Sequence, residues 1–381
     1  MSQPRHPFRY ALLALCLLHL GFFAWQQAGS ISAISGLLYA NGTPVGGDFI
    51  NLWTAGRLVL EGRIGEIYDY AAFMAQEVEL TGAPIGVRFW AYPPHSLLFA
   101  WPFGLVGFYP ALLAWSLMGL LVLALGCRRL GMDRLETLIV LISPASVLCL
   151  FYGQTGNLGT GLLLLALAGG RGRDVPAIVA AAFLTMKPQM GFLLPLYWLA
   201  ERRWVRLVVT SLAVLAILAV TLILPGLEAW WAYLGQTLPG LSQLERHGTG
   251  PFITMIPSIF MALRIVTGDG DLAIRLHILF AVPIVVLALW RLWRLDHDLR
   301  RVAVMLAATV LVTPYLHNYD LTMLAVAALL VLRRFPPGAR GEVLVAILVG
   351  VLIGLPQLVV LFNLSGFPVS PLLILPLLLL A

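Results

Sequence analysis

Charged residues are scarce in this chain. Only 11% of its 381 residues are charged, whereas 60% are hydrophobic, and soluble domains carry about 25% charged residues. The composition therefore predicts a protein that lies largely in lipid. Helices and closed barrels satisfy every backbone polar group in a bilayer, but barrel strands need alternating polar and apolar residues. Runs such as LLLLALA and LLVLALG do not alternate, so we predict an all-α polytopic membrane protein.

Cysteine and the common hydrolase signatures are also rare or missing. The three cysteines, Cys16, Cys127 and Cys149, lie inside or at the ends of apolar runs, and their spacing indicates neither a disulfide framework nor a metal site. The sequence contains no H-E-x-x-H and no G-x-S-x-G motif, which argues against a zinc protease or a serine hydrolase. We predict no cofactor; a divalent metal is an alternative that the sequence does not indicate.

Lysine is almost absent, so the net charge of +6 comes from arginines in short clusters between apolar runs. This placement is typical of cytoplasmic loops and does not indicate nucleic-acid binding. The clusters are Arg5/Arg9, Arg128/Arg129/Arg134, Arg171/Arg173, Arg202/Arg203/Arg206, Arg291/Arg294/Arg300/Arg301 and Arg333/Arg334/Arg340. With every cluster in the cytoplasm, the chain fits about 11–12 transmembrane helices and a cytoplasmic N-terminus. We expect them over 10–29 (retained, although a cleaved signal peptide is an alternative), 109–127, 135–152, 157–170, 175–187, 188–200, 205–224, 272–292, 302–316, 319–333, 343–361 and 370–381.

Two long segments then fall on the extracytoplasmic side of a single membrane domain that spans residues 1–381. The first loop, 30–108, has patterns that predict short helices on the membrane surface. The second segment, 225–271, carries aromatic residues suited to the interface. The candidate helices over 157–170, 175–187 and 188–200 are shorter than the roughly 20 residues needed to cross a bilayer. We therefore expect broken or tilted helices around a polar cavity.

The remaining polar motifs all fall on the same outer face in this topology. Polar residues near membrane depth are costly and tend to mark functional pathways, so we expect one extracytoplasmic site. The motifs are GGD with Asp48, YPPH with Tyr92 and His95, YGQTGN with Gln154 and Asn157, MKPQ with Lys187 and Gln189, and PYLHNYD with His317, Asn318 and Asp320.

Lys187 is the single lysine of the chain and lies where the positive-inside rule disfavours a cation. Pro188 follows it and can break the helix. An ammonium group at this place can hold a phosphate as a compact charge, and Arg88, also outside, could assist. The alternative is a lysine that extends its charged head to the interface from a helix end.

Asp48 follows two glycines and has no acidic neighbour before Glu61. Its carboxylate could act as a general base towards a sugar hydroxyl, because a base needs hydrogen-bond reach and a suitable pKa. The alternative is a helix N-cap, which the following FINLW also suits. The two roles are compatible.

The other motif residues have structural alternatives as well. His317 and Asp320 could be an interfacial histidine and a cap, or part of the site. Gln154 and Asn157 could form a neutral turn or donate amide hydrogen bonds to sugar hydroxyls. The stretch 92–95 is stiffened by two prolines and could be purely structural.

Five stretches, taken in order, resemble glycosyltransferase family eighty-seven, from about residue 46 to 325. They are GGDFINLWTAGRLVLEGRIGEIYD, YPPHSLLFAWPFGLVGF, YGQTGNLGTGLLLLALA, MKPQMGFLLPLYWLAERRW and TPYLHNYDLTML. Members of that family are multi-spanning enzymes of the GT-C architecture, related to mannosyltransferases that use polyprenyl-phosphomannose. The resemblance implies a GT-C-like bundle with a catalytic acid in the first outer loop, at Asp48, and the lysine of a K-P-Q stretch at Lys187. Many GT-C enzymes carry paired acids in this loop, whereas Asp48 stands alone here.

The expected function is the inverting transfer of a sugar, mannose-like or a pentose, from a polyprenyl-phosphate donor to a glycan or glycolipid acceptor at the outer face of the cell membrane. Asp48 is the expected base. Residues expected at the donor phosphate are Lys187, Arg88 and His317, and those expected at the substrate are Gln154, Asn157, Gln189, Asn318, Asp320, Tyr92 and His95. Two alternatives remain: a transporter or flippase for a lipid-linked or polar solute, which would favour repeat symmetry and charges at mid-membrane, or a non-catalytic member of the same fold.

Overall fold

Five helices of the computed structural model, which describes residues 7–169, 174–295 and 298–381, are long and apolar enough to cross a membrane. They are α1 (Phe8–Ile31), α6 (Phe108–Arg129), the stretch Trp204–His247, α18 (Gly270–Arg294) and α21 (Glu342–Leu364). The pair α7 (Arg134–Leu141) and α8 (Pro144–Phe151), bent by 48°, adds a sixth span if it is counted as one. The all-α polytopic membrane class is confirmed. Length and composition account for five or six of the about 11–12 expected spans, and the remaining candidates are shorter helices.

The shorter apolar helices lie mostly inside the bundle. They are α2 (Phe49–Leu60), α9 (Gly156–Leu167), α10 (Val175–Leu184), α20 (Thr322–Leu332) and α22 (Ser370–Leu380), and α19 (Asp298–Val312) packs with α20. Every residue of α20 is buried, as is every residue of α9 except Leu165. Short helices are tolerated at membrane depth when protein rather than lipid surrounds them. The long helices form the perimeter, where Leu18, Leu212 and Leu279 are 73%, 60% and 65% exposed, as suits lipid contact.

One of the expected short helices is divided. The prediction of a single helix over 188–200 is wrong, because α11 (Pro188–Gly191) and α12 (Leu194–Ala200) are separate. Each carries a proline in its first turn, where the missing N–H costs little, and Pro195 therefore favours a new start after Leu193.

Glycines let two pairs of helices approach closely. A Cβ atom on Gly161 of α9 would lie 2.5 Å from the backbone nitrogen of Leu123 in α6, and a Cβ on Gly104 of α5 (Leu97–Gly104) would lie 2.5 Å from the carbonyl carbon of Gly56 in α2. Small residues at such crossings are common where helices pack in membranes. The α6–α9 crossing positions α9 against α6. The α2–α5 crossing positions α2, the helix that follows Asp48, against α5.

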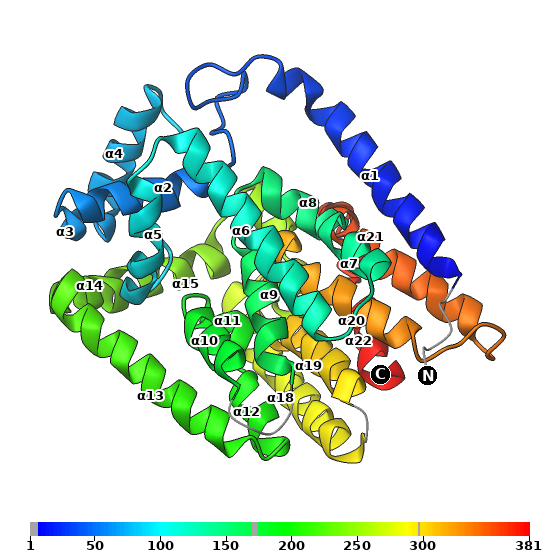
Figure 1. The fold of residues 1–381 in the computed structure, drawn as a ribbon. Helices are drawn as coiled ribbons and strands as arrows, with labels where there is room; N and C mark the ends of the chain where they lie inside the picture. Colours follow the sequence, from blue (N-terminus) through cyan, green and yellow to red (C-terminus); the bar gives the residue numbers. More distant parts are fainter. Residues whose placement is uncertain (1–6, 170–173, 296–297) are drawn as a thin grey trace.

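The helices of the first loop gather at one end of the molecule, which we call the distal end (Figure 1). They are α2, α3 (Ile64–Ile67), α4 (Tyr70–Thr81), η1 (Pro94–Ser96) and α5. The expectation of short helices in 30–108 is confirmed. They pack on one another, with α2 against α3, α4 and α5.

The second expected outer segment, 225–271, is also largely helical. It contains η2 (Leu222–Gly226), α14 (Leu227–Ala232), η3 (Tyr233–Thr237), α15 (Leu238–His247), α16 (Pro251–Thr254) and α17 (Ile259–Thr267). After α13 (Trp204–Thr221), the chain turns at Pro225 and Gly226, and α14 and α15 lead back towards the centre of the molecule (Figure 1). Gly226 has a φ of +85°, which other residues rarely adopt.

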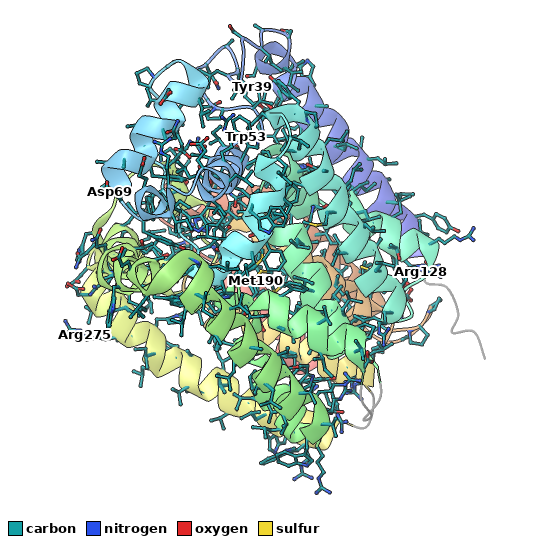
Figure 2. All side chains as sticks on the ribbon, turned by 60° about the vertical axis from the view of Figure 1, so that its left-hand side comes forward. Tyr39, Trp53, Asp69, Arg128, Met190 and Arg275 are labelled. Carbon is teal, nitrogen blue, oxygen red and sulfur yellow. The ribbon has the colours of Figure 1, made fainter. Side chains whose placement is uncertain are left out.

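The basic clusters that the structure describes are tied together by ion pairs, and we call this region the basic end. These pairs are Arg9 with Asp133 and Glu136, Arg333 with Glu136, Arg129 and Arg206 with Asp174, and Arg301 with Glu201. Figure 2 shows Arg128 well away from Tyr39, Trp53 and Asp69. These paired arginines lie together in the described structure, and the cytoplasmic placement of the clusters stays a prediction; Arg5, Arg171 and Arg173 lie outside the described ranges.

Glu77 is buried within the distal end without a partner. Its side chain on α4 is inaccessible, and neither carboxylate oxygen has a hydrogen-bond partner in the described part of the chain. Burial raises the pKa of Glu77 from 4.5 to about 8, because apolar surroundings disfavour the charged form. Glu77 is therefore mainly protonated at neutral pH.

This raised pKa makes folding stability depend on pH. The folded protein holds a proton on Glu77 that the unfolded chain releases, so stability falls by up to ~1.4 kcal/mol per pH unit between pH 4.5 and about 8. Glu77→Gln keeps a neutral side chain of the same size and should flatten this slope. Melting temperatures of both proteins in detergent, measured across this range, test the expectation. Parallel curves would show that Glu77 is solvated or paired.

Candidate active site

The loop before α2 and the turn between α8 and α9 meet backbone to backbone. Gly47 has a φ of +52°, and a Cβ atom there would lie 2.8 Å from the Cα of Tyr152. Gly153 has a φ of +58°, and a Cβ there would overlap the carbonyl oxygen of Gly46. The backbone N–H of Asp48 donates to the carbonyl of Tyr152 at 3.0 Å. Gly47 of the GGD motif is thus explained by this contact, which fixes the position of Asp48, whereas a Cβ on Gly46 would lie 2.8 Å from the side chain of Leu112.

The carboxylate of Asp48 is exposed and held by two side chains. Asp48 precedes α2, but its side chain makes no capping hydrogen bond, so the capping interpretation is wrong. Its Oδ1 is paired with Arg88, and its Oδ2 accepts a hydrogen bond from Nε2 of Gln154 at 2.6 Å. The side chain of Asp48 is 48% exposed, against 15% for Arg88. The carboxylate is therefore oriented from two sides and still open to a ligand.

Arg88 is carried by the segment between α4 and η1, which is anchored on both sides. Its backbone N–H contacts the sulfur of Met74 in α4 at 3.2 Å, and the next residue, Phe89, accepts a hydrogen bond from Asn51 of α2 at 3.3 Å. The Nε of Arg88 is buried and has no hydrogen-bond partner among the described residues. The pair with Asp48 therefore leaves the Nε–H donor of Arg88 without an acceptor among the described residues.

Lys187 forms a buried ion pair across the bundle. Its Nζ lies 2.5 Å from Oδ1 of Asp320, and the two side chains are 7% and 0% exposed. The Nζ also lies 5.6 Å from the ring centroid of Tyr319, a cation–π contact. The ammonium group thus points into the protein, and the interpretation of Lys187 as an interfacial lysine is wrong. Asp320 also caps η4 (Asn318–Asp320), since its Oδ2 accepts the N–H of His317 at 3.3 Å.

His317 lies beside this pair as a neutral ring. It stacks on Tyr319 with 5.1 Å between ring centroids. Burial lowers the pKa of His317 to about 4, with a partly offsetting effect from the charge of Asp320. At neutral pH this residue can offer hydrogen bonds to a phosphate but no positive charge.

The turn 152–157 connects the two charged groups. Gln154 binds Asp48, and a Cβ on Gly156 would lie 3.1 Å from Oδ1 of Asp320, so the turn passes directly over that carboxylate. Glycine at 156 is therefore required by the contact with η4. The structure thus brings together residues that are 106 and 133 positions apart along the chain, namely Asp48 with Gln154 and Lys187 with Asp320.

Tyr92 gives a second connection between these groups. Its hydroxyl lies 3.3 Å from Oγ1 of Thr155. Burial raises the pKa of the Tyr92 phenol, and the nearby charge of Lys187 opposes this rise. Tyr92 is therefore close to the ion pair, and it lies four residues after Arg88 on the same segment.

His95 and Gln189 lie at the edges of this region. The ring of His95 is 7% exposed, stacks on Trp230 of α14 with 6.0 Å between centroids, and has no hydrogen-bond partner among the residues described. The carbonyl of Gln189 accepts a hydrogen bond from Thr313 at 3.1 Å, and its half-buried side chain lies on α11, next to Lys187.

The amides of Asn157 and Asn318 bind other parts of the protein. Asn157 donates to Oγ of Ser146 at 2.9 Å and accepts from Thr322 at 3.0 Å. Asn318 donates to the carbonyl of Pro356 at 2.9 Å. Both side chains are buried, at 2% and 4% exposure, so they hold helices together.

Sequence reasoning missed Arg88 as the partner of Asp48, and it missed Thr155 and Tyr319. Thr155 and Tyr319 lie inside the YGQTGN and PYLHNYD motifs, so the motifs themselves were the signal that could have found them.

In the described ranges, no three His, Cys, Asp or Glu side chains are grouped so that they could hold a metal ion. A small hollow opens behind the turn, lined by Trp115, Ser116, Gly119, Cys149, Leu150, Gln154, Asn157 and Leu158.

A sequence model of glycosyltransferase family 87 matches residues 90–314, more than half of the chain. The chain belongs to this family. Comparison with curated proteins and with solved structures found no match. Glycosyltransferase family 87 is a membrane family of the GT-C type, so this protein is a membrane glycosyltransferase. The matched range contains Gln154 and Lys187. Asp48 and Asp320 lie outside this range, but Asp48 is hydrogen-bonded to Gln154 and Asp320 to Lys187.

The buried ion pair of this family 87 enzyme should be important for stability. Lys187→Met leaves the carboxylate of Asp320 buried without a counter-charge, and breaking such a pair costs about 3–5 kcal/mol. The double variant Lys187→Met/Asp320→Asn removes both charges and should recover part of the loss. Melting temperature and yield in detergent are the measurements.

Arg57→Met provides the matched control, because it breaks the exposed pair of Arg57 and Glu61 and such pairs contribute about 0–1 kcal/mol. If Lys187→Met melted like this control, the buried pair would not be formed in the membrane protein.

Proposed function

We propose that this enzyme transfers a sugar from a polyprenyl-phosphate donor to a glycan or glycolipid acceptor, with inversion, and that Asp48 is the general base. The observation that carries the proposal is an exposed carboxylate oriented by Gln154 and lying beside a cation, Arg88. A base must be reachable by the hydroxyl it activates and fixed in direction. Asp48 meets both requirements.

The proposed reaction is a single displacement. The acceptor hydroxyl oxygen forms a bond to the anomeric carbon of the sugar, while the bond from that carbon to the phosphate oxygen breaks. The hydroxyl proton passes to Asp48, and the electron pair of the broken bond stays on the phosphate. Acceptor and phosphate must lie on opposite faces of the sugar, with a separation comparable to the roughly 6.5–9.5 Å between the carboxyl groups of inverting hydrolases.

The donor phosphate is assigned to Arg88 and Lys187, with His317 as a neutral hydrogen-bonding neighbour. The leaving phosphate gains negative charge, and fixed donors aimed at such charge stabilise the transition state. Asp320 orients Lys187 in this scheme and does not contact the sugar. In this scheme the lipid tail of the donor lies against the apolar faces of the perimeter helices.

The remaining predicted residues take different roles in this scheme. Tyr92, His95 and Gln189 stay as candidate sugar contacts, since each lies near Lys187 or Arg88 in the chain or in space. Gln154 is reassigned to positioning Asp48. Asn157 is left out because its amide is bound within the protein at both ends, and Asn318 is left out because its amide nitrogen is bound to the carbonyl of Pro356.

We also propose that the distal end faces the extracytoplasmic side of the cell membrane and the basic end faces the cytoplasm. The arginine clusters support this orientation through the positive-inside rule. The helix α1, which carries Arg9 near its start, would then begin in the cytoplasm.

Asp48→Asn tests the proposed base. The amide keeps the size of the side chain but cannot accept the proton, so we expect the turnover number to fall by roughly 10²–10⁴-fold. The assay is the release of lipid phosphate by the purified enzyme from a panel of polyprenyl-phosphate sugars that includes hexoses and pentoses.

Asp69→Asn is the matched control in the same loop. Asp69 accepts the N–H of Ala72 at 2.9 Å as the N-cap of α4, and this change should cost about 1 kcal/mol of stability or less without loss of transfer. Normal turnover by Asp48→Asn would remove the base assignment.

A further inference from the structure

Arg88 is paired with the residue that must accept a proton. A cation beside a carboxylate favours its charged form and so opposes protonation. Arg88 is 15% exposed and Asp48 is 48% exposed, so water screens this pair in part. If Arg88 stayed on Asp48 throughout the reaction, the general base would be weakened at the moment it is needed.

We propose that the guanidinium of Arg88 is passed from Asp48 to the leaving phosphate during sugar transfer. This inference rests on the proposed function and adds to it a coupling between the base and the leaving group. Arg88 thereby acts on both ends of the reaction.

The charge balance of the reaction supports this transfer. The donor is a phosphodiester with one negative charge, and Asp48 carries another. When the acceptor oxygen bonds to the sugar and the phosphate leaves with the electron pair, the acceptor proton neutralises Asp48. The phosphate monoester therefore leaves with two negative charges, one more than it carried in the donor. Asp48 thus loses its negative charge while the leaving phosphate gains one. The guanidinium of Arg88 is then attracted more strongly to the phosphate than to Asp48.

The arrangement of Arg88 suits a group that is shared. A guanidinium has five N–H donors in a rigid fork, and its Nε is buried without a partner among the described residues. The backbone is anchored at Met74 and through Phe89 to Asn51, so the side chain alone needs to move. Gln154 remains bound to Asp48 and keeps the carboxylate in place when Arg88 moves away.

Lys187 is less suited to this role. Its ammonium is bound to Asp320, which is completely buried, and neither group takes up the acceptor proton in the proposed reaction. The charge of that pair therefore stays balanced throughout, whereas the charge beside Arg88 changes.

Binding of farnesyl phosphate, a short prenyl phosphate, tests the proposal without turnover. In the wild type, the charged Asp48 competes with the phosphate for Arg88. Asp48→Asn removes the competitor, so we expect the Kd for farnesyl phosphate to fall by about tenfold. Arg88→Gln should raise the Kd, and Asp69→Asn should leave it unchanged. Isothermal titration calorimetry of the purified proteins, each checked for a wild-type melting temperature, gives these values.

The double variant Asp48→Asn/Arg88→Gln separates the transfer of Arg88 from simple charge repulsion. If Arg88 is shared, the gain from Asp48→Asn disappears in the Arg88→Gln background. Equal gains in both backgrounds would show that Asp48 merely repels the phosphate and would overturn the proposal. Arg88→Lys, which keeps the charge, covers the case in which Arg88→Gln does not fold, and the gain should then shrink but persist.

The outcomes for the inference and for the proposed function can be told apart. If Asp48→Asn abolishes transfer but leaves the Kd unchanged, the base assignment stands and the sharing of Arg88 is overturned. If Asp48→Asn transfers sugar at the wild-type rate, the assignment of Asp48 as the base fails, whatever the Kd, and if the wild type releases no lipid phosphate from any polyprenyl-phosphate sugar, the proposed function fails.

Discussion

The contact between the GGD loop and the turn 152–157 is the constraint on which the candidate site depends. Two left-handed glycines allow the two backbones to touch, and this contact places Asp48 beside Gln154. The same turn lies against Asp320, so the position of the second charged group follows from it. One short turn between two buried helices therefore determines the distance between the distal loop and the ion pair at the bundle centre. A substitution there would alter both at once.

The charges of the protein are used differently at its two ends. At the basic end, arginines pair with acids that join neighbouring helix ends, and these pairs serve assembly. At the site, the two ion pairs join residues that lie 40 and 133 positions apart along the chain. Asp48 remains open to solvent, whereas Asp320 is inaccessible. This difference in exposure is why we propose a chemical role for Asp48 and a positioning role for Asp320.

The sequence was sufficient for the helical membrane class, the helices of the first loop and the grouping of the polar motifs. Hydropathy and arginine placement are local signals, and they do not depend on which helices touch. The partners of individual charges could not be predicted in the same way. Asp320 was expected as a cap or a substrate contact and Lys187 as a phosphate ligand, and their pairing was missed because it joins positions 133 residues apart. The division of 188–200 was also missed, although Pro195 marks the place where α12 begins.

The helix α20 is completely enclosed by protein, has only 11 residues and begins just after Asp320. A segment so short and so close to a carboxylate gains little from lipid on its own. Its place in the bilayer must therefore come from helices already there, and Lys187 emerges from the ribosome well before it. Lys187 is therefore already in the chain when Asp320 is made, so the carboxylate can pair with it as soon as α20 packs into the bundle.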